Sequence, residues 1–229
     1  MKTIVFDTGP IISLTMNNLL WILEHLKKVS NADFCITGLV KKELVDKPLN
    51  KTKRFMFEAL QVLHYIENKT VEVVDSNEIR NQTSKLLSIA NKCFKAFGNN
   101  INIVHEAEMS IIALYLQKKA DAFVVDERTA RLLIENPNKL LNILRHTLHT
   151  DVKENRNNIA KIRKLTKNIK IIRSVELVTV AYEMGLLNSY KADIPNPNKT
   201  LLESVLWGVK LNGCAVSKRE IEQIMRIEK

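Results

Sequence analysis

Acidic residues recur along this 229-residue chain where short apolar runs end or where the following helix begins. The acids at these positions are Asp7, Glu43, Glu106, Glu108, Asp126 and Glu127. Ionised carboxylates beside buried strands are unstable unless paired, and neighbouring carboxylates raise one another's pKa unless a cation neutralises them. The candidate ligands are oxygen atoms, and His105 is the only histidine within these motifs. The pattern therefore predicts a site for Mg²⁺ or Mn²⁺ rather than Zn²⁺.

Each of these acids also has a purely structural interpretation. Asp7 could form a turn before Thr-Gly-Pro, and Glu43 could be an exposed helix residue beside two lysines. Glu106 and Glu108 could favour a helix N-terminus through the helix dipole, and their spacing of two predicts that one of them lines the site. Asp126 could cap the helix that follows it. Singly these alternatives compete, but all the acids falling at one end of one sheet favours a site.

The elements that must position these acids follow from the apolar patterns. Runs rich in β-branched residues predict strands at residues 2–6, 33–36, 71–74, 122–125 and 169–172. Thr37 is the predicted cap of the helix after the second strand, and a long helix is predicted from about 78 to 97, ending at Gly98. Further helical patterns cover residues 55–66, 106–117, 128–136, 174–185, 201–211 and 218–227.

Two of the helix starts have predicted caps. Ser174 is the predicted cap of its helix, and Ser217 with Glu220 forms a capping box for the last one. Strands that alternate with helices predict an α/β fold with a mainly parallel sheet, followed by a helical tail. Because the carboxyl ends of parallel strands meet at one edge of a sheet, the acids are expected to lie together there.

The positive charge of the chain is concentrated in one segment. The whole chain carries +10, and residues 138–173 hold ten basic and two acidic residues, a local excess of +8. Such a stripe is typical of a polyanion-binding surface, although a solvated basic face explains it equally well. Two helices around a polar break near 150–158 are expected here, and without an aromatic residue the segment is not expected to stack bases. The candidate nucleic-acid contacts are Lys153, Arg156, Lys161, Arg163, Lys164 and Lys167.

Other classes of protein are disfavoured. Cys35, Cys93 and Cys214 lie far apart, which argues against a disulfide framework or a zinc finger and favours a reduced, cytoplasmic protein. No apolar run approaches the roughly 20 residues of a membrane helix, so no membrane association is expected. Glycine-rich nucleotide motifs and a Ser-His or Cys-His arrangement are absent from the sequence. Phosphatases of the haloacid-dehalogenase type need an acid two positions after Asp7, where this chain has Gly9.

Three segments together resemble the PIN-domain family of metal-dependent nucleases. They are IVFDTGP, ITGLVKKEL and HEAEMSIIALYLQKKADAFVVDERTARLL, and they fall within residues 1–135. The chain is most similar to a prokaryotic branch that includes VapC-type toxins and carries a GEAEAIALA-like segment. The likeness resumes at IKIIRSVELVTVAYEMGLL, and NGCAVSKREIEQIM is similar to the helical tail of that branch.

The resemblance implies a three-layer α/β/α fold with a C-terminal helical extension. It divides the chain into a nuclease domain at 1–173, with a basic insertion at about 138–168, and an extension at 174–229. It also implies a catalytic set of Asp7, Glu43, Glu108 and Asp126, of which Asp7, Glu108 and Asp126 hold metal. Glu43, Glu106 and Glu127 are further candidate ligands, and Thr8 and Arg128 are expected to line the site.

Two departures from the family pattern bear on this assignment. His105 stands where the family usually has Gly, and the usual pair of acids after the fourth strand reads Asp126-Glu127, so either could be the last ligand. The hypothesis is a Mg²⁺- or Mn²⁺-dependent endoribonuclease, either a toxin of a toxin–antitoxin pair or an RNA-processing enzyme. The partners it implies are RNA, an antitoxin protein and a second copy in a homodimer. The alternative is a catalytically silent PIN-fold module that binds nucleic acid or protein.

Overall fold

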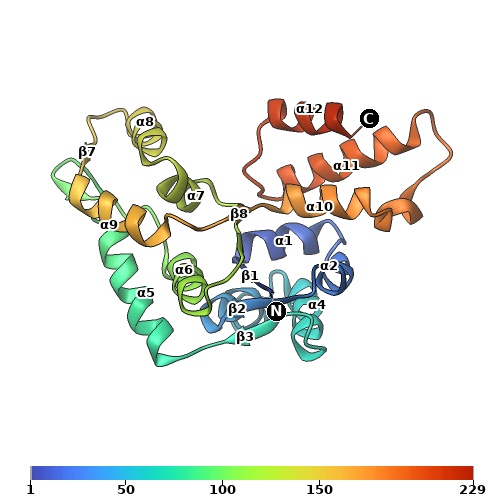
Figure 1. The fold of residues 1–229 in the computed structure, drawn as a ribbon, viewed down its shortest axis with the longest axis horizontal. Helices are drawn as coiled ribbons and strands as arrows, with labels where there is room; N and C mark the ends of the chain where they lie inside the picture. Colours follow the sequence, from blue (N-terminus) through green and yellow to red (C-terminus); the bar gives the residue numbers. More distant parts are fainter. Residues whose placement is uncertain (1, 229) are drawn as a thin grey trace.

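The computed structural model describes residues 2–228 and has a five-stranded parallel sheet at its centre (Figure 1). The strand order is β3-β2-β1-β6-β8, so the first strand is the middle one. The strands are β1 (Lys2–Phe6), β2 (Ala32–Thr37), β3 (Glu72–Val74), β6 (Ala122–Val124) and β8 (Ile171–Ile172). All five predicted strands are therefore confirmed, together with the predicted α/β class.

Helices cover both faces of this sheet. The chain moves from β1 to β3 in one direction and then crosses to β6 and β8 in the other, and right-handed crossovers place the two groups of helices on opposite faces. One group contains α1 (Thr8–Met16), α2 (Ile22–Ser30) and α4 (Met56–Glu67), and α1 packs against α4. The other contains α5 (Asn77–Ala90), α6 (Glu106–Lys118), α7 (Arg128–Glu135), α8 (Pro137–Leu148) and α9 (Arg156–Thr166).

The predicted helix over residues 78–97 is confirmed as far as Ala90 and is wrong over its last seven residues, 91–97. Helix α5 ends at Ala90, and the chain then forms a hairpin of β4 (Phe94–Ala96) and β5 (Asn99–Asn100). Phe94 and Ala96 are buried while Lys95 between them is exposed, which is the period of a strand rather than a helix. Gly98, with φ +79°, lies in the hairpin turn and does not end a helix.

The basic segment forms two helices around a polar break, as predicted, but the break contains a strand that the sequence did not indicate. Strand β7 (Lys153–Glu154) pairs with β4, so a second, antiparallel sheet has the order β5-β4-β7. Residues 138–170 of the segment lie between β6 and β8, so they belong to the crossover that joins two neighbouring strands of the main sheet.

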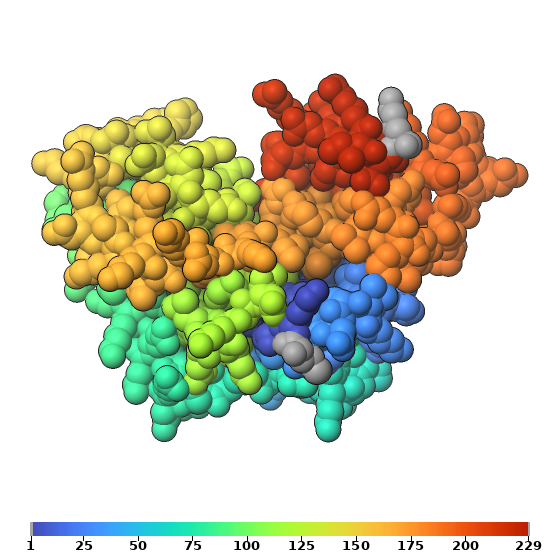
Figure 2. All heavy atoms as spheres, in the orientation of Figure 1, coloured from blue at the N-terminus to red at the C-terminus, as the bar shows by residue number. Residues whose placement is uncertain are grey.

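The C-terminal helices pack on the face that carries α1. They are α10 (Ser174–Glu183), the short η3 (Leu186–Tyr190), α11 (Pro197–Leu211) and α12 (Lys218–Ile227). A side chain at Gly208 in α11 would clash with Asn17 at the end of α1, so the two helices approach closely. The space-filling view shows a hollow between α7–α8, in yellow-green, and α12, in red (Figure 2).

The predicted caps of these helices are half right. Ser217 and Glu220 form the capping box at the start of α12. Ser174 is the first residue of α10 and not its cap, because the Arg173 backbone N–H donates to Glu176 and Arg173 takes the capping position. The Arg173 guanidinium also donates to Glu220 at 2.8 Å and so ties α12 to the start of α10.

Candidate active site

The acidic residues gather where the order of the strands reverses. Strand β1 has β2 on one side and β6 on the other, and ligand sites of parallel α/β sheets form at such a switch, outside the carboxyl ends of the strands. Asp7 directly follows β1, and its backbone N–H donates to the carbonyl of Val124 at the end of β6, 2.9 Å away. Asp126 and Glu127 follow two and three residues after Val124.

Asp7 is a deeply buried acid at this edge of the sheet. The residue is 3% exposed, and its Oδ1 atom has no hydrogen-bond partner among the described residues. Burial raises the pKa of Asp7 to about 7, against the lowering effect of the Thr8 backbone N–H. The nearby carboxylates of Glu108, Glu43 and Glu127 raise this pKa further. These four acids therefore share one electrostatic environment.

Glu108 reaches the cluster from the first turn of α6. One of its oxygens, Oε2, accepts a hydrogen bond from the His105 backbone N–H at 2.7 Å, which leaves Oε1 free of that contact. Burial raises the pKa of Glu108 to about 7 despite this bond, and Glu127 and Glu43 add to the increase. Helix α6 is fixed to the sheet by a 2.7 Å hydrogen bond between Ser110 and Thr37 at the end of β2.

Glu43 lies in η1 (Lys42–Asp46), a π-helical stretch that continues the short helix α3 (Gly38–Lys41). Thr37 caps α3 by accepting from the Val40 backbone N–H, as predicted. The Thr8 hydroxyl donates to Oε2 of Glu43 at 3.0 Å, and Lys47 lies 3.6 Å from Oε1. Thr8, the residue directly after Asp7, thus links the start of α1 to an acid of η1.

Asp126 and Glu127 have different environments although they are adjacent. The Asp126 carboxylate is buried and accepts from the backbone N–H of Ser174 at 2.8 Å and from its hydroxyl at 2.7 Å, and Cys214 also hydrogen-bonds to it. Burial raises its pKa, and the bonds from Ser174 oppose that increase. Glu127 instead caps α7 by accepting from the Ala130 backbone N–H at 2.6 Å, and it raises the pKa of both Asp7 and Glu108.

The remaining candidates lie outside the cluster. Glu106 and Arg128 are exposed, and neither contributes to the shifted pKa values of Asp7 and Glu108. Sequence reasoning missed Ser174 and Cys214 as partners of Asp126. They lie 48 and 88 residues further along the chain, and no local pattern indicates such a distant contact.

Compared with known protein families, residues 3–138 match the PIN domain, which is more than half of the 229 residues. The chain belongs to the PIN-domain family. PIN domains are typically nucleases that bind nucleic acid and use divalent metal ions, so the general class expected from the sequence is supported. No curated protein and no solved structure matches this PIN domain. In residues 2–228 no helix is both long enough and apolar enough to span a membrane.

The donor set of this PIN domain suits a hard divalent cation. The carboxylates of Glu43 and Glu127 lie close enough to raise the pKa of both Asp7 and Glu108, and a buried Asp7 oxygen lacks any partner. In the conformation described for residues 2–228, no three His, Cys, Asp or Glu side chains converge on one metal position. Like charges repel, and the three glutamates are held by Thr8, His105 and Ala130. A cation would draw their free oxygens inward.

We predict that Asp7→Asn stabilises the metal-free protein at pH 8. Burial of Asp7 gives it a pKa of about 7 in the folded state against 3.8 for the exposed group, so the folded protein holds the proton more tightly. The wild type therefore loses stability as the pH rises from about 4 to 7, by at most about 4 kcal/mol. Asp7→Asn avoids this loss. Denaturant unfolding in EDTA at pH 4 and pH 8 measures the difference.

The matched control is Asp193→Asn, because Asp193 is exposed. Its unfolding free energy is expected to follow the wild type at both pH values. A metal-free Asp7→Asn protein that is less stable than the wild type at pH 8 contradicts the buried, unpaired state of this carboxylate.

Proposed function

We propose that this PIN domain is a Mg²⁺- or Mn²⁺-dependent endoribonuclease that hydrolyses RNA phosphodiester bonds. The observation that supports it most directly is Asp7, a buried carboxylate with an unpartnered oxygen and three glutamates nearby. Such an arrangement is unfavourable for stability alone, and a divalent cation would relieve it. The same observation disfavours the catalytically silent alternative, because a module that only binds nucleic acid or protein has no use for a destabilising cluster of carboxylates.

The ligands we assign are Asp7, Glu108 and Glu127, with Glu43 as a fourth acid. Glu108 and Glu127 each use one oxygen to cap a helix, so the other oxygen is available to a metal. Glu43 is oriented by Thr8, which would keep it beside the site as a ligand or as a base for a bound water. Asp126, the ligand that the family resemblance suggests, is assigned a structural role because Ser174 occupies both of its oxygens.

When bound, the metal would lower the pKa of a water molecule and stabilise negative charge on the phosphate undergoing attack. The chain contributes the geometry. Asp7, which follows the central strand, would hold the metal together with Glu108 of α6 and with Glu127, which caps α7. The N-termini of these two helices point their backbone N–H groups toward the same edge, which favours negative charge there. Arg128, exposed in the first turn of α7, is our candidate for contact with a substrate phosphate.

Substrate binding is assigned to the exposed basic side chains of the crossover between β6 and β8. Arg156 pairs with Glu154, whereas Lys153, Lys161, Arg163, Lys164 and Lys167 form no ion pair with any residue from 2 to 228. Cations that lack internal partners are available to phosphates, and binding through them falls as salt increases.

Cleavage assays test the proposed activity. Purified protein is incubated with single-stranded and with structured RNA, in Mn²⁺ or in EDTA. We expect cleavage only with the metal, and a loss of at least 100-fold in Asp7→Asn because that variant removes the central ligand. Asp193→Asn, which leaves the site intact, should cleave like the wild type. Activity that persists in EDTA or in Asp7→Asn contradicts the proposal.

The choice between Glu127 and Asp126 has a separate test. Glu127→Gln is expected to weaken Mn²⁺ binding, measured by calorimetry, about tenfold or more, with little change in unfolding temperature. Asp126→Asn is expected to retain Mn²⁺ affinity but to lose about 2 kcal/mol of stability, because the donors on Ser174 lose part of their acceptor. The reverse pattern assigns the metal to Asp126.

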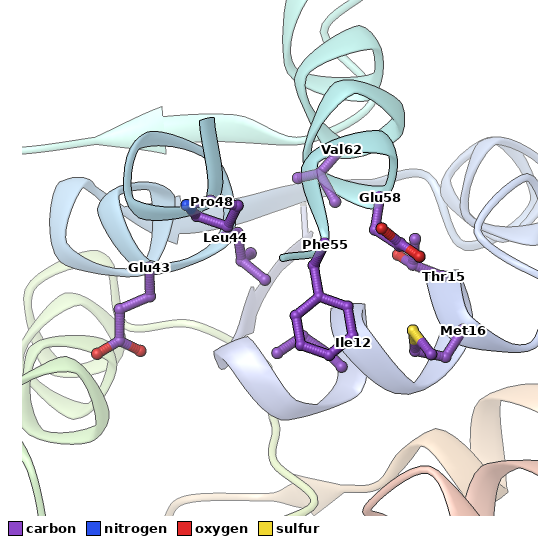
Figure 3. A pocket seen from close by; sticks show the side chains of 9 residues that line it. All are labelled: Ile12, Thr15, Met16, Glu43, Leu44, Pro48, Phe55, Glu58 and Val62. Atoms are coloured by element: carbon purple, nitrogen blue, oxygen red, sulfur yellow. The ribbon is translucent and has the colours of Figure 1, made fainter. Parts of the chain in front are cut away.

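We also propose that a neutralising antitoxin binds next to the acidic site. An apolar pocket lies between α1, η1 and α4, where the ring of Phe55 stands beside Ile12 and the carboxylate of Glu43 points away from them (Figure 3). Four exposed cations precede Phe55: Lys47, Lys51, Lys53 and Arg54. An apolar segment flanked by acidic residues complements both features, and it would cover Glu43 when bound.

The partner to test is the product of a short reading frame upstream of this gene, co-expressed with this chain. Ile12→Gln and Phe55→Asn are expected to weaken the complex about tenfold while RNA cleavage by the free protein is unchanged. Phe55 has φ +63°, a conformation that Asn accepts, so the ring is removed without backbone strain. Val29→Asn, exposed on α2, is the matched control. The toxin role is contradicted if neither pocket variant changes the affinity of the complex, or if no such reading frame exists.

A further inference from the structure

The second sheet joins two parts of the chain that are distant in sequence. Strand β4 pairs on one side with β5, its hairpin partner, and on the other with β7 from the basic crossover. The junction is reinforced beyond the strands, because the Asn155 backbone N–H donates to the carbonyl of Cys93 at 2.7 Å and the Asn158 side chain donates to the carbonyl of Lys92 at 3.1 Å. The hairpin and the start of α9 therefore form one surface.

Two lysines lie directly opposite each other in this sheet. The register pairs Lys95 with Lys153, and both are exposed. Side chains at opposed positions of antiparallel strands lie close together, and like charges there are destabilising. Neither lysine forms an ion pair with a residue from 2 to 228. A polyanion bound over this face would neutralise both charges at once.

The hairpin turn exposes an aromatic ring. Phe97 is 75% exposed and has φ +50°, and Gly98 after it has φ +79°. Two successive residues with positive φ are typical of a type I′ turn, where Asn or Gly is favoured and a bulky side chain is strained. The ring is not among the side chains packed against the core. Its strain is therefore not compensated by burial, which points to a role outside the fold.

We propose that the hairpin and β7 form a binding platform for single-stranded RNA, with Phe97 stacking on a base and Lys95 and Lys153 contacting phosphates. The proposal rests on the nuclease function above and adds the class of RNA. An exposed ring can stack on the face of an unpaired base, which a duplex does not offer. The surrounding side chains are polar, with Asn99 and Asn100 exposed on β5, so an apolar protein surface is a poorer match.

The platform is connected to the acidic site through a short, fixed segment. Residues 101–105 lead from β5 to α6, which carries Glu108. The Asn91 side chain accepts from the backbone N–H groups of Ile103 and Val104 at 2.8 and 3.1 Å, so this connection is held in place. RNA bound on the platform would enter the site at a defined position.

Fluorescence anisotropy with a labelled, unstructured 15-nucleotide RNA tests the platform in EDTA, where no metal-dependent cleavage occurs. Phe97→Asn is expected to weaken binding at least about fivefold, because stacking on one base is lost. Asn adopts a positive φ more readily than Phe, so the unfolding temperature of Phe97→Asn should equal or exceed that of the wild type. Lys95→Gln and Lys153→Gln should each weaken binding and reduce the slope of log affinity against log salt by about 0.7.

The matched controls are Phe57→Gln, an exposed ring on α4, and Lys28→Gln, an exposed lysine on α2, and both should bind RNA like the wild type. Equal binding by Phe97→Asn, or equally tight and equally Phe97-dependent binding of a 15-base-pair duplex, overturns the platform. The platform is also overturned if Phe97→Asn binds RNA like the wild type but no longer self-associates in light scattering, because Phe97 would then contact a second copy of the chain. A wild type that cleaves RNA while these variants bind normally refutes the platform alone, whereas a wild type without metal-dependent cleavage refutes the nuclease function.

Discussion

The burial of the Asp7 carboxylate at the end of the central strand is the constraint on which the site depends. The position is fixed because β1 has neighbours on both sides and the Asp7 backbone is bonded to β6. Burial removes water from the carboxylate, and the approach of three glutamates makes its charged form still less favourable. The elements around it limit that repulsion locally: Thr8 binds Glu43, and two helix N-termini bind Glu108 and Glu127. The same contacts hold the acids ready beside one another.

A second consequence concerns the C-terminal helices. Asp126 accepts from Ser174 at the start of α10, and its backbone carbonyl accepts from the Ala215 N–H at 3.0 Å. Two distant segments of the extension therefore meet on the residue that precedes Glu127. These bonds hold the backbone and side chain of Asp126, and Glu127 directly after it caps α7 through Ala130. The C-terminal helices thus support the segment that carries Glu127.

Local patterns in the sequence were sufficient for most of the main sheet. Short apolar runs such as Ile4–Phe6 are typical of strands in a parallel sheet covered on both faces, and the acids that follow them are placed by the strand ends. The hairpin after α5 was missed because Phe94, Lys95 and Ala96 also fit the helical pattern before them, and their pairing with β7 is a contact across about 60 residues. The different environments of Asp126 and Glu127 could not be predicted either, because they depend on the contact of Asp126 with the distant Ser174.

The arrangement of charge explains how an acidic site and a polyanionic substrate can be compatible. Phosphates are repelled by four clustered carboxylates, so affinity for RNA has to come from other parts of the molecule. Residues 138–170 of the crossover between β6 and β8 hold nine basic and two acidic residues, an excess of +7, and Lys95 extends that surface into the hairpin before α6. Phosphates bound on this distant surface are repelled little by the carboxylates, whereas a phosphate that approaches Asp7 is repelled strongly. A cation that neutralises the cluster would remove this barrier, so the same ion that activates water would also admit the substrate.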